Sequence, residues 1–446
     1  MSAPATTMPP PAWPDGRSRY QVPPGTLPRL LAASPGEENP ACLRGHIGLL
    51  GPVPYRGGRG RLIGEIAAAG LTGRGGAAFP VHRKMAAVAG AGRDPVAAGN
   101  GAEGEPASRK DRWLLWHAPH LVLDGLQLAA EAVGAPAAAL YVHRDAVLLR
   151  HLDLALGQRA AARADRAAVE LVGAPARFLA GEESALASRA AGGPARPGSK
   201  RPPVYVRGIG GRPTLVQNVE TLAHIALIAR LGPDWFRSVG TAAEPGSMLC
   251  TVLGPGRVSR VVEAALGTPL AALADCSAGV QAVLCGGYHG AWLPAADAAR
   301  LALSNADLKP AGAFAGAGVL AALPAGYCGL AETARVARYL ALESAGQCGP
   351  CFNGLPRIAA ALSGLAGPRP SPRLLADLRR WTGLVSGRGA CHHPDGTVRF
   401  VRSALTVFGG EIDMHLGGRC SAAREPGRAG FLPLPPQPPQ HESDWR

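Results

Sequence analysis

The 446-residue sequence has little that would place the protein in a membrane or on nucleic acid. No uninterrupted apolar run reaches the length of about 20 residues that a membrane-spanning helix needs. The N-terminus shows no basic region followed by an apolar run, so we expect no signal peptide. The formal net charge is +14, but the arginines are spread along the chain, and there is no basic helix with interleaved aromatic residues. We therefore expect a cytoplasmic protein without membrane insertion or nucleic-acid binding.

The cysteines do not fit a disulfide framework, because nine of them lie at uneven spacing in a long chain. Cys348 and Cys351 form a Cys-x-x-Cys pair, and Cys391 follows downstream. Thiolates at such spacing bind iron–sulfur clusters or structural zinc, and both kinds of site normally use four ligands. Only three cysteines are obvious candidates here. The cysteines at positions 42, 250, 276, 285 and 420 are expected to pack as small apolar residues.

Strand and helix patterns alternate between about residues 56 and 240. The stretches 96–106 and 169–190 each begin as a strand and enter a loop, 138–144 is typical of a buried strand, and helices are predicted at 120–135 and 214–232. Because strands and helices alternate, the predicted fold class is α/β.

The rest of the chain divides into stretches of different composition. Residues 245–315 carry short strands and predict a small α+β module. Residues 325–425 carry amphipathic helices together with the Cys-x-x-Cys pair. The two ends, 1–55 and 426–446, are rich in proline and are expected to be loose.

Four short motifs gather glycines and polar residues on loops and helix starts. They are GRGGAAFP (73–80), NGAEGEP (100–106), GEE (181–183) and QNVET (217–221). Glycines let backbone N–H groups approach a phosphate, but a dinucleotide-binding loop should follow a strand, and the first motif follows a predicted helix. The helix dipole alone favours Glu182 and Glu183 at a helix start, and Asn218 is expected inside a helix, where asparagine is disfavoured without a polar role. Taken singly, each motif is better explained by local structure than by function.

Taken together and in this order, the motifs resemble one family. With Lys110-Asp-Arg112 after the second motif and Cys348-Gly-Pro-Cys351 after the fourth, they are similar to the NADH-binding flavoprotein (51 kDa) subunit of respiratory complex I. The diaphorase subunits of NAD-linked hydrogenases and formate dehydrogenases share the pattern. The resemblance extends from about Leu62 to Gly410. It implies a Rossmann-like core that binds FMN and NADH, a small ubiquitin-like (SLBB-type) domain around GTPLAALAD and VLCGGYHGAWL, and a C-terminal helical bundle with an iron–sulfur site.

The resemblance also implies roles for individual residues. Contacts with FMN and the nicotinamide nucleotide are expected from Gly73, Arg74, Gly75, Phe79, Lys84, Asn100, Glu103, Glu182, Asn218 and Thr221. Glu105 and Glu183 are the candidate catalytic residues beside the nicotinamide. Cys348, Cys351 and Cys391 are the expected ligands of a [4Fe–4S] cluster. In this family NADH passes a hydride to FMN, while the protein supplies stacking, orientation and tuning of the potential.

The sequence departs from the family at three positions. Ala102 stands where the flavin loop usually has aspartate, and Gln217 replaces an asparagine. Ala345 stands at the first cysteine of the usual cluster motif, and alanine cannot bind iron.

Three interpretations of the cysteine site remain open at this point. A cluster binds through the three cysteines, with water, His392, Cys328 or a partner's side chain as the fourth ligand. Alternatively no cluster binds, or zinc occupies the three thiols together with His392.

These observations lead to two functional hypotheses. In the first, the chain is an NADH dehydrogenase-type flavoprotein subunit that passes electrons through an altered [4Fe–4S] site to a ferredoxin-like or quinone-reductase partner. It would be cytoplasmic, or peripheral to a membrane through that partner. In the second, a divergent paralogue without turnover keeps the fold as a docking or regulatory subunit.

Overall fold

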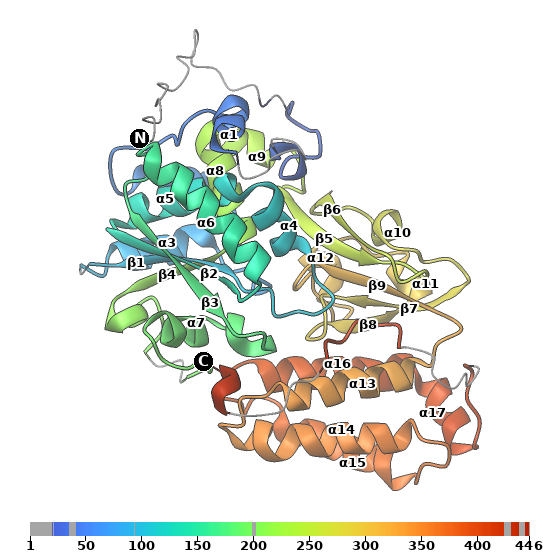
Figure 1. The fold of residues 1–446 in the computed structure, drawn as a ribbon. Coiled ribbons are helices and arrows are strands. Elements are labelled where there is room, and N and C mark those ends of the chain that lie inside the picture. Colours follow the sequence, from blue (N-terminus) through green and yellow to red (C-terminus); the bar gives the residue numbers. More distant parts are fainter. Residues whose placement is uncertain are drawn as a thin grey trace, which may run out of the picture.

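The computed structural model describes residues 20, 22–34, 42–92, 94–198, 202–422, 430–436 and 442–445. Three parts follow one another along the chain and pack together: a layered α/β part, a part built on a second sheet, and a bundle of helices (Figure 1). No helix in these ranges combines the length and the apolar character needed to cross a membrane.

The first sheet is fully parallel and has the order β3-β2-β1-β4. Its strands are β1 (Val96–Gly101), β2 (Ala137–His143), β3 (Ala168–Ala174) and β4 (Thr214–Asn218). The predicted α/β class is confirmed, but the predicted helix at 214–232 is wrong in its first turn, because residues 214–218 form β4. The chain passes from this strand into α8 (Val219–Leu231) without a loop, so the apolar pattern gives no boundary signal. Asn218 therefore caps the helix instead of lying inside it.

Helices cover both faces of this sheet, as parallel sheets require. One face carries α2 (Arg61–Ala69), α3 (Val81–Ala89), α5 (Pro119–Val133) and α8, and α7 (Glu183–Ala190) lies on the other face (Figure 1). Further helices are α1 (Leu43–Leu50), α4 (Lys110–His117), α6 (Ala146–Ala161) and α9 (Pro233–Arg237). α5 is buried almost all round, and it packs so closely on α8 that a Cβ added at Gly125 would lie 1.9 Å from the carbonyl oxygen of Leu222.

The second sheet has the order β6-β5-β9-β7-β8. Its strands are β5 (Ser247–Leu253), β6 (Ser259–Ala265), β7 (Val280–Cys285), β8 (Ala291–Pro294) and β9 (Val319–Pro324). The first and last strands, β5 and β9, lie side by side and parallel at the centre, which is the arrangement of ubiquitin-like folds. β9 lies beyond residue 315, the predicted end of this module. Short helices α10 (Leu270–Leu273), α11 (Ala295–Ala298) and α12 (Asn305–Leu308) cover one face.

The other face of the second sheet packs against the C-terminal helices. These are α13 (Gly329–Leu342), α14 (Leu355–Leu365), α15 (Arg373–Val385), α16 (His393–Val407) and α17 (Gly409–Leu416). Amphipathic patterns at 332–345, 355–366 and 373–385 predict the first three of these helices, whereas no pattern predicted α16 and α17. Trp292 of β8 lies in this core with Phe400 of α16, at a ring-centroid distance of 6.1 Å.

The expected loose termini lie partly outside the described residues, namely at 1–19, 21, 35–41, 426–429, 437–441 and 446. Where the structure describes these segments, the expectation of looseness is wrong. The backbone N–H groups of Arg29 and Leu30 donate to the Glu263 carboxylate at 2.6 and 2.7 Å. At the other end, Phe431 and Trp445 are buried. Proline-rich composition thus failed to reveal segments that specific partners hold in place.

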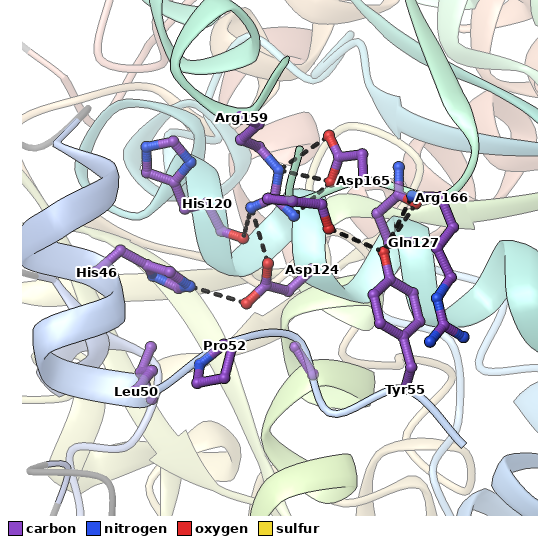
Figure 2. Close-up of polar contacts among 12 residues, drawn as sticks. His46, Leu50, Pro52, Tyr55, His120, Asp124, Gln127, Arg159, Asp165 and Arg166 are labelled. Carbon is purple, nitrogen blue, oxygen red and sulfur yellow. Dashed lines mark hydrogen bonds and ion pairs between the residues drawn. The ribbon is translucent and has the colours of Figure 1, made fainter. Parts of the chain in front are cut away.

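A buried group of charges joins four helices of the first part (Figure 2). Asp124 of α5 lies 2.8 Å from His46 of α1 and 2.8 Å from Arg159 of α6, and it also contacts Arg230 of α8. Arg159 forms a second ion pair with Asp165 at 2.7 Å. Burial alone would raise the pKa of Asp124, but the neighbouring His46, Arg230 and Arg159 hold it well below its usual range. Asp124 is therefore a charged anchor for the helical layer.

Replacing this anchor should destabilise the protein. We expect Asp124→Asn to lower the free energy of unfolding by about 3–5 kcal/mol, because two buried guanidinium groups lose their shared carboxylate. Since the pKa of Asp124 is depressed in the fold, its contribution is present above the unfolded pKa of about 3.9 and is lost as pH falls below it. Thermal and urea unfolding at several pH values would measure both effects. Asp153→Asn, at an exposed site on α6, is the matched control, and equal stability of the two variants would contradict the prediction.

Candidate functional site

The glycine-rich loop at 73–80 connects α2 to α3. A Thr72–Pro80 bridge closes it, and the Gly73 N–H donates to the Phe79 carbonyl at 2.9 Å. The Arg74 N–H donates to Thr221 Oγ1 at 2.9 Å, which fixes the loop to the first turn of α8. A Cβ added at Gly75 would meet the Asn218 side chain at 3.3 Å, so a glycine keeps this approach open.

The Arg74 side chain turns away from the Thr221 contact toward β5. Its guanidinium donates to the Ser247 carbonyl at 3.1 Å and to Thr72 Oγ1 at 2.7 Å. Nη2 of Arg74 is buried without a hydrogen-bond partner among the described residues. A buried, unpaired donor of this kind is available to an acceptor on a bound molecule.

A charged cluster lies at the carboxyl ends of β1 and β4. Lys110 is buried and pairs with Asp111 at 2.7 Å and with Glu220 at 2.9 Å. Burial would lower the pKa of Lys110, but the negative charges of Asp111 and Glu220 raise it, so the ammonium stays charged. The Asn218 side chain caps α8 by accepting from the Glu220 N–H at 3.0 Å, and it donates to Asp111 at 2.7 Å.

Two further motifs meet in front of this cluster. Asn100, at the end of β1, donates from its side chain to the Gly181 carbonyl at 2.8 Å. Glu103 accepts the N–H groups of Asp111 and Arg112, both at 3.1 Å, and so caps α4. Glu182 accepts the Ser184 N–H at 2.8 Å and caps α7. The capping explanation of Glu182 is therefore correct as a description of its contacts.

Glu105 joins the first part to the second sheet. Its carboxylate accepts the Tyr288 N–H at 2.7 Å and the Ala107 N–H at 3.2 Å. A Cβ added at Gly287, where φ is +86°, would lie 2.6 Å from this carboxylate. Burial raises the pKa of Glu105 to about 7, partly offset by the hydrogen bond from the Tyr288 backbone. The group is thus held at the junction in a place where either protonation state is accessible near neutral pH.

A cavity of about 280 Å³ lies where these elements meet. Among the predicted residues it is lined by Arg74, Gly75, Asn100, Glu103, Glu105, Glu182, Asn218 and Cys391. A larger cavity, of about 920 Å³, lies between β8 and α16 and contains none of the predicted residues. One cavity thus brings together all four loop motifs and one of the cysteines.

The remaining predicted residues lie outside the lining of this cavity. Gly73 borders a separate cavity of about 90 Å³ on the other side of the loop. Thr221 acts through its bond to Arg74, and Lys84 forms an ion pair with Glu183. Phe79 is 53% exposed, an unusual fraction for a large aromatic side chain.

Several lining residues were not predicted as site residues. Lys110 and Asp111 form the charged floor, and Phe178, His289 and His393 line a wall. His393 Nε2–H donates to the Leu340 carbonyl at 2.8 Å, so its Nδ1 is left to accept from His289 Nε2–H at 2.9 Å. Burial lowers the pKa of His393 to about 4 and holds the pKa of His289 well below its usual value, so both rings are neutral at pH 7. The position of His393 two residues after Cys391 was the one available signal.

The three predicted cysteine ligands lie near one another at the end of α13. Cys351 is buried within hydrogen-bond range of Cys348 and Ser344, and burial raises its pKa, as do the Cys348 and Cys391 thiols. Within the described residues, these thiols and His392 do not converge to the spacing of a single zinc ion. An iron–sulfur cluster, several ångströms wide, fits this looser set better than zinc does.

Cys328 cannot complete that set. It caps the N-terminus of α13, whereas the Cys-x-x-Cys pair follows the C-terminus of the same helix. Fourteen helical residues separate the two ends by ~20 Å, so this candidate for the fourth ligand is wrong. Ser344 contacts Cys351, and the neighbouring Ala345 stands where the family's motif has its first cysteine.

The cavity has the features that an anionic flavin phosphate would need. The N-terminus of α8, the Lys110 ammonium and the open backbone at Gly75 converge on it. The glycine loops approach each other so closely that a Cβ added at Gly104 would lie 2.3 Å from the Phe178 carbonyl oxygen. The residues present therefore fit FMN, and the cysteine set provides three of four usual ligands for a cluster.

Comparison with known proteins agrees with this geometry. Residues 66–227 match the model of the Nuo51 FMN-binding domain, and residues 331–415 match that of the NADH-ubiquinone oxidoreductase-F iron–sulfur binding region. A NADH-quinone oxidoreductase subunit of Streptomyces coelicolor is 30% identical over 382 residues, which cover 80% of this chain and 83% of that protein. The mitochondrial NADH dehydrogenase [ubiquinone] flavoprotein 1 of Dictyostelium discoideum is 29% identical over 377 residues, covering 80% and 79%.

A solved structure extends the comparison to the fold. A crystal structure of an NAD+-reducing [NiFe]-hydrogenase in the H2-reduced state matches with a TM-score of 0.74 and 29% identity. The match covers 80% of this chain and 62% of the hydrogenase chain. The predicted fold and family resemblance are thereby confirmed: the chain belongs to the 51 kDa flavoprotein family of NADH-quinone oxidoreductases, with an FMN-binding domain and an iron–sulfur binding region.

Proposed function

We propose that the chain is the NADH-oxidising flavoprotein subunit of a larger redox complex, with FMN in the cavity beneath the glycine loop. The observation that carries the proposal is the convergence of all four motifs on one cavity that also reaches Cys391. When bound, FMN would supply the hydride chemistry and an iron–sulfur cluster would supply one-electron transfer. The chain's own residues bind, orient and shield these groups.

The flavin phosphate would bind at the first turn of α8. Asn218 shapes this turn, and Lys110 adds a positive charge that Asp111 and Glu220 hold in place. The nearby N–H of Arg74 is fixed by Thr221, so the loop needs little reorganisation on binding. The isoalloxazine ring would lie toward Asn100 and the Gly181-Glu182 turn, where the loops already pack closely.

The nicotinamide nucleotide would approach from the side of Phe79 and the Lys84–Glu183 pair. Phe79 is exposed on the glycine loop and offers a face for stacking on an aromatic base. Lys84 and Glu183 neutralise each other in the free protein, and either can exchange its partner for a polar group of NADH. Glu105 lines the cavity, and the Tyr288 N–H holds its carboxyl group in place. A carboxyl group held in this way suits orientation of the nucleotide better than proton transfer.

Electrons would leave through a cluster held by Cys348, Cys351 and Cys391, with the fourth position open. His392 is exposed, lies 4.0 Å from Asp395 and lines the cavity beside Cys391. The acceptor would be a ferredoxin-like or other redox subunit, and the protein would be cytoplasmic or held at a membrane surface through that partner.

The alternative of a docking paralogue without turnover is supported by Ala102 and Ala345. Ala102 removes a carboxylate from the flavin site, and Ala345 removes a thiolate from the cluster site.

A side chain added at Gly75 should weaken flavin binding. We expect Gly75→Val to weaken FMN affinity at least tenfold and to abolish NADH-driven dye reduction, because the added side chain collides with Asn218. Gly157→Val on α6 is the matched control, since a Cβ there meets nothing within 4 Å. Flavin fluorescence quenching measures the affinity. A Gly75→Val protein that binds FMN and turns over like wild type would refute the location of the site. A wild-type protein that does not reduce the dye with NADH would favour the docking alternative.

Restoring the missing thiol should stabilise the cluster. We expect Ala345→Cys, after anaerobic reconstitution, to retain about four iron ions per chain through gel filtration while wild type loses iron more readily. Ala345→Ser, which changes size similarly without adding a thiolate, should behave like wild type. Iron and sulfide analysis with electron paramagnetic resonance would report the difference. No gain in iron retention with Ala345→Cys would mean that position 345 does not face the cluster.

A further inference from the structure

A second group of metal-binding side chains lies at the other end of α13, away from the cofactor cavity. It consists of Cys328, Glu411, His415 and Cys420, whose ligand atoms all lie within 4.8 Å of one another. Cys328 and His415 are buried, and Glu411 and Cys420 are half-buried. Cys420 packs against the helical core, as expected of a small apolar residue, and its thiol also belongs to this polar group.

The spacing within the group is that of ligands around one ion. Cys328 Sγ lies 3.4 Å from His415 Nε2 and 3.5 Å from Glu411 Oε1, and the last two atoms lie 3.1 Å apart. Zinc–sulfur bonds of ~2.3 Å and zinc–nitrogen or –oxygen bonds of ~2.0 Å at tetrahedral angles place neighbouring ligand atoms about 3.2–3.8 Å apart. The observed distances fall at this spacing.

Neighbouring backbone groups aim the side chains inward. His415 Nδ1–H donates to the Gly367 carbonyl at 3.0 Å, which leaves the lone pair of Nε2 facing the group. The Ser421 N–H donates to Glu411 Oε1 at 3.1 Å, and the Ala331 N–H donates to Cys328 Sγ at 3.4 Å. Cys328 is also the N-cap residue of α13.

A cation would suit this arrangement. With Nδ1 donating to Gly367, a neutral His415 turns its Nε2 lone pair toward the Glu411 carboxylate at 3.1 Å, and two acceptors at that distance repel each other unless a proton or a metal cation lies between them. A metal cation there would also be within reach of the two cysteines. Glu411 and His415 are four residues apart on α17, so one face of the helix presents both.

We propose that Cys328, Glu411, His415 and Cys420 bind one structural zinc ion. The protein fills all four coordination positions, and a closed site of this kind stabilises a fold and does not catalyse. The ion joins the start of α13 to α17 and to the segment that follows it. Through His415 and Gly367 it also secures the turn between α14 and α15. The site is independent of the FMN proposal, because ~20 Å of helix separates it from the Cys-x-x-Cys pair.

Metal analysis of the full-length protein, produced with iron and zinc supplied, tests the proposal. We expect about one zinc per chain in wild type and less than a tenth of that in the double variant Cys328→Ala/Cys420→Ala. The double variant Cys348→Ala/Cys351→Ala is the matched control, which should lose iron and keep zinc. Glu411→Gln should weaken zinc affinity at least tenfold in a competition titration with a chromogenic chelator.

A measurement on unmutated protein guards against variants that fail to fold. Zinc removal by a chelator should lower the thermal midpoint, and zinc should restore it where magnesium does not. Substitution with cobalt(II) should give the visible absorption of a tetrahedral thiolate site. The proposal would be overturned if wild type produced with zinc supplied contained no zinc, or if zinc were lost only when Cys348 and Cys351 are replaced. Iron in place of zinc at this site, or a Cys328–Cys420 disulfide in the purified protein, would also overturn it.

Discussion

The first turn of α8 is the constraint on which the rest of the candidate site depends. Parallel pairing of β1 and β4 places Asn100 beside Asn218, so the loops that follow both strands open at the same edge of the sheet. Within that turn Asn218 caps the helix, Thr221 fixes the glycine loop, and the buried Glu220 holds Lys110. Glu220 also accepts the Leu249 N–H of β5 at 2.8 Å, so the same turn positions the second sheet.

The cavity lies where three separately patterned parts of the chain meet, and each junction uses a buried polar contact. Glu105 reaches the second sheet at Tyr288, and His289 of that sheet contacts His393 of α16. Arg177 of the first part pairs with Glu343, just after α13, at 3.1 Å. Buried polar contacts tolerate little displacement, because a lost partner leaves a desolvated group unpaired. The distance from the flavin cavity to the cysteines is therefore fixed by the fold.

Much of this could be predicted from the sequence. The helix at 120–135 and the strand at 138–144 were evident because their apolar patterns and the glycine at Gly134 are local signals. The strand β4 was missed because its pairing with β1 is a long-range contact and its apolar run continues into α8. For the same reason Asn218 was expected inside a helix.

The candidate site shows the same contrast between local sequence signals and long-range contacts. Motif order identified residues that the cavity brings together, and the helix-start pattern indicated the capping role of Glu182. The sequence could not reveal that Glu103 caps α4 or that Lys110 forms the floor of the cavity. The group around Cys328 and His415 joins positions far apart in sequence and has no local spacing signal on the cysteine side. Such convergence emerges only from packing.

The most direct test of the central claim is an anaerobic titration of FMN-reconstituted, full-length protein with NADH, followed by absorption. The account predicts bleaching of the flavin band within about one equivalent of NADH, with loss of absorbance from a cluster as further NADH supplies the additional electron. Bleaching would require that the cavity holds FMN where a nicotinamide can reach it. A flavin band that stays unchanged in excess NADH, or a protein that retains no flavin after reconstitution, would contradict the account.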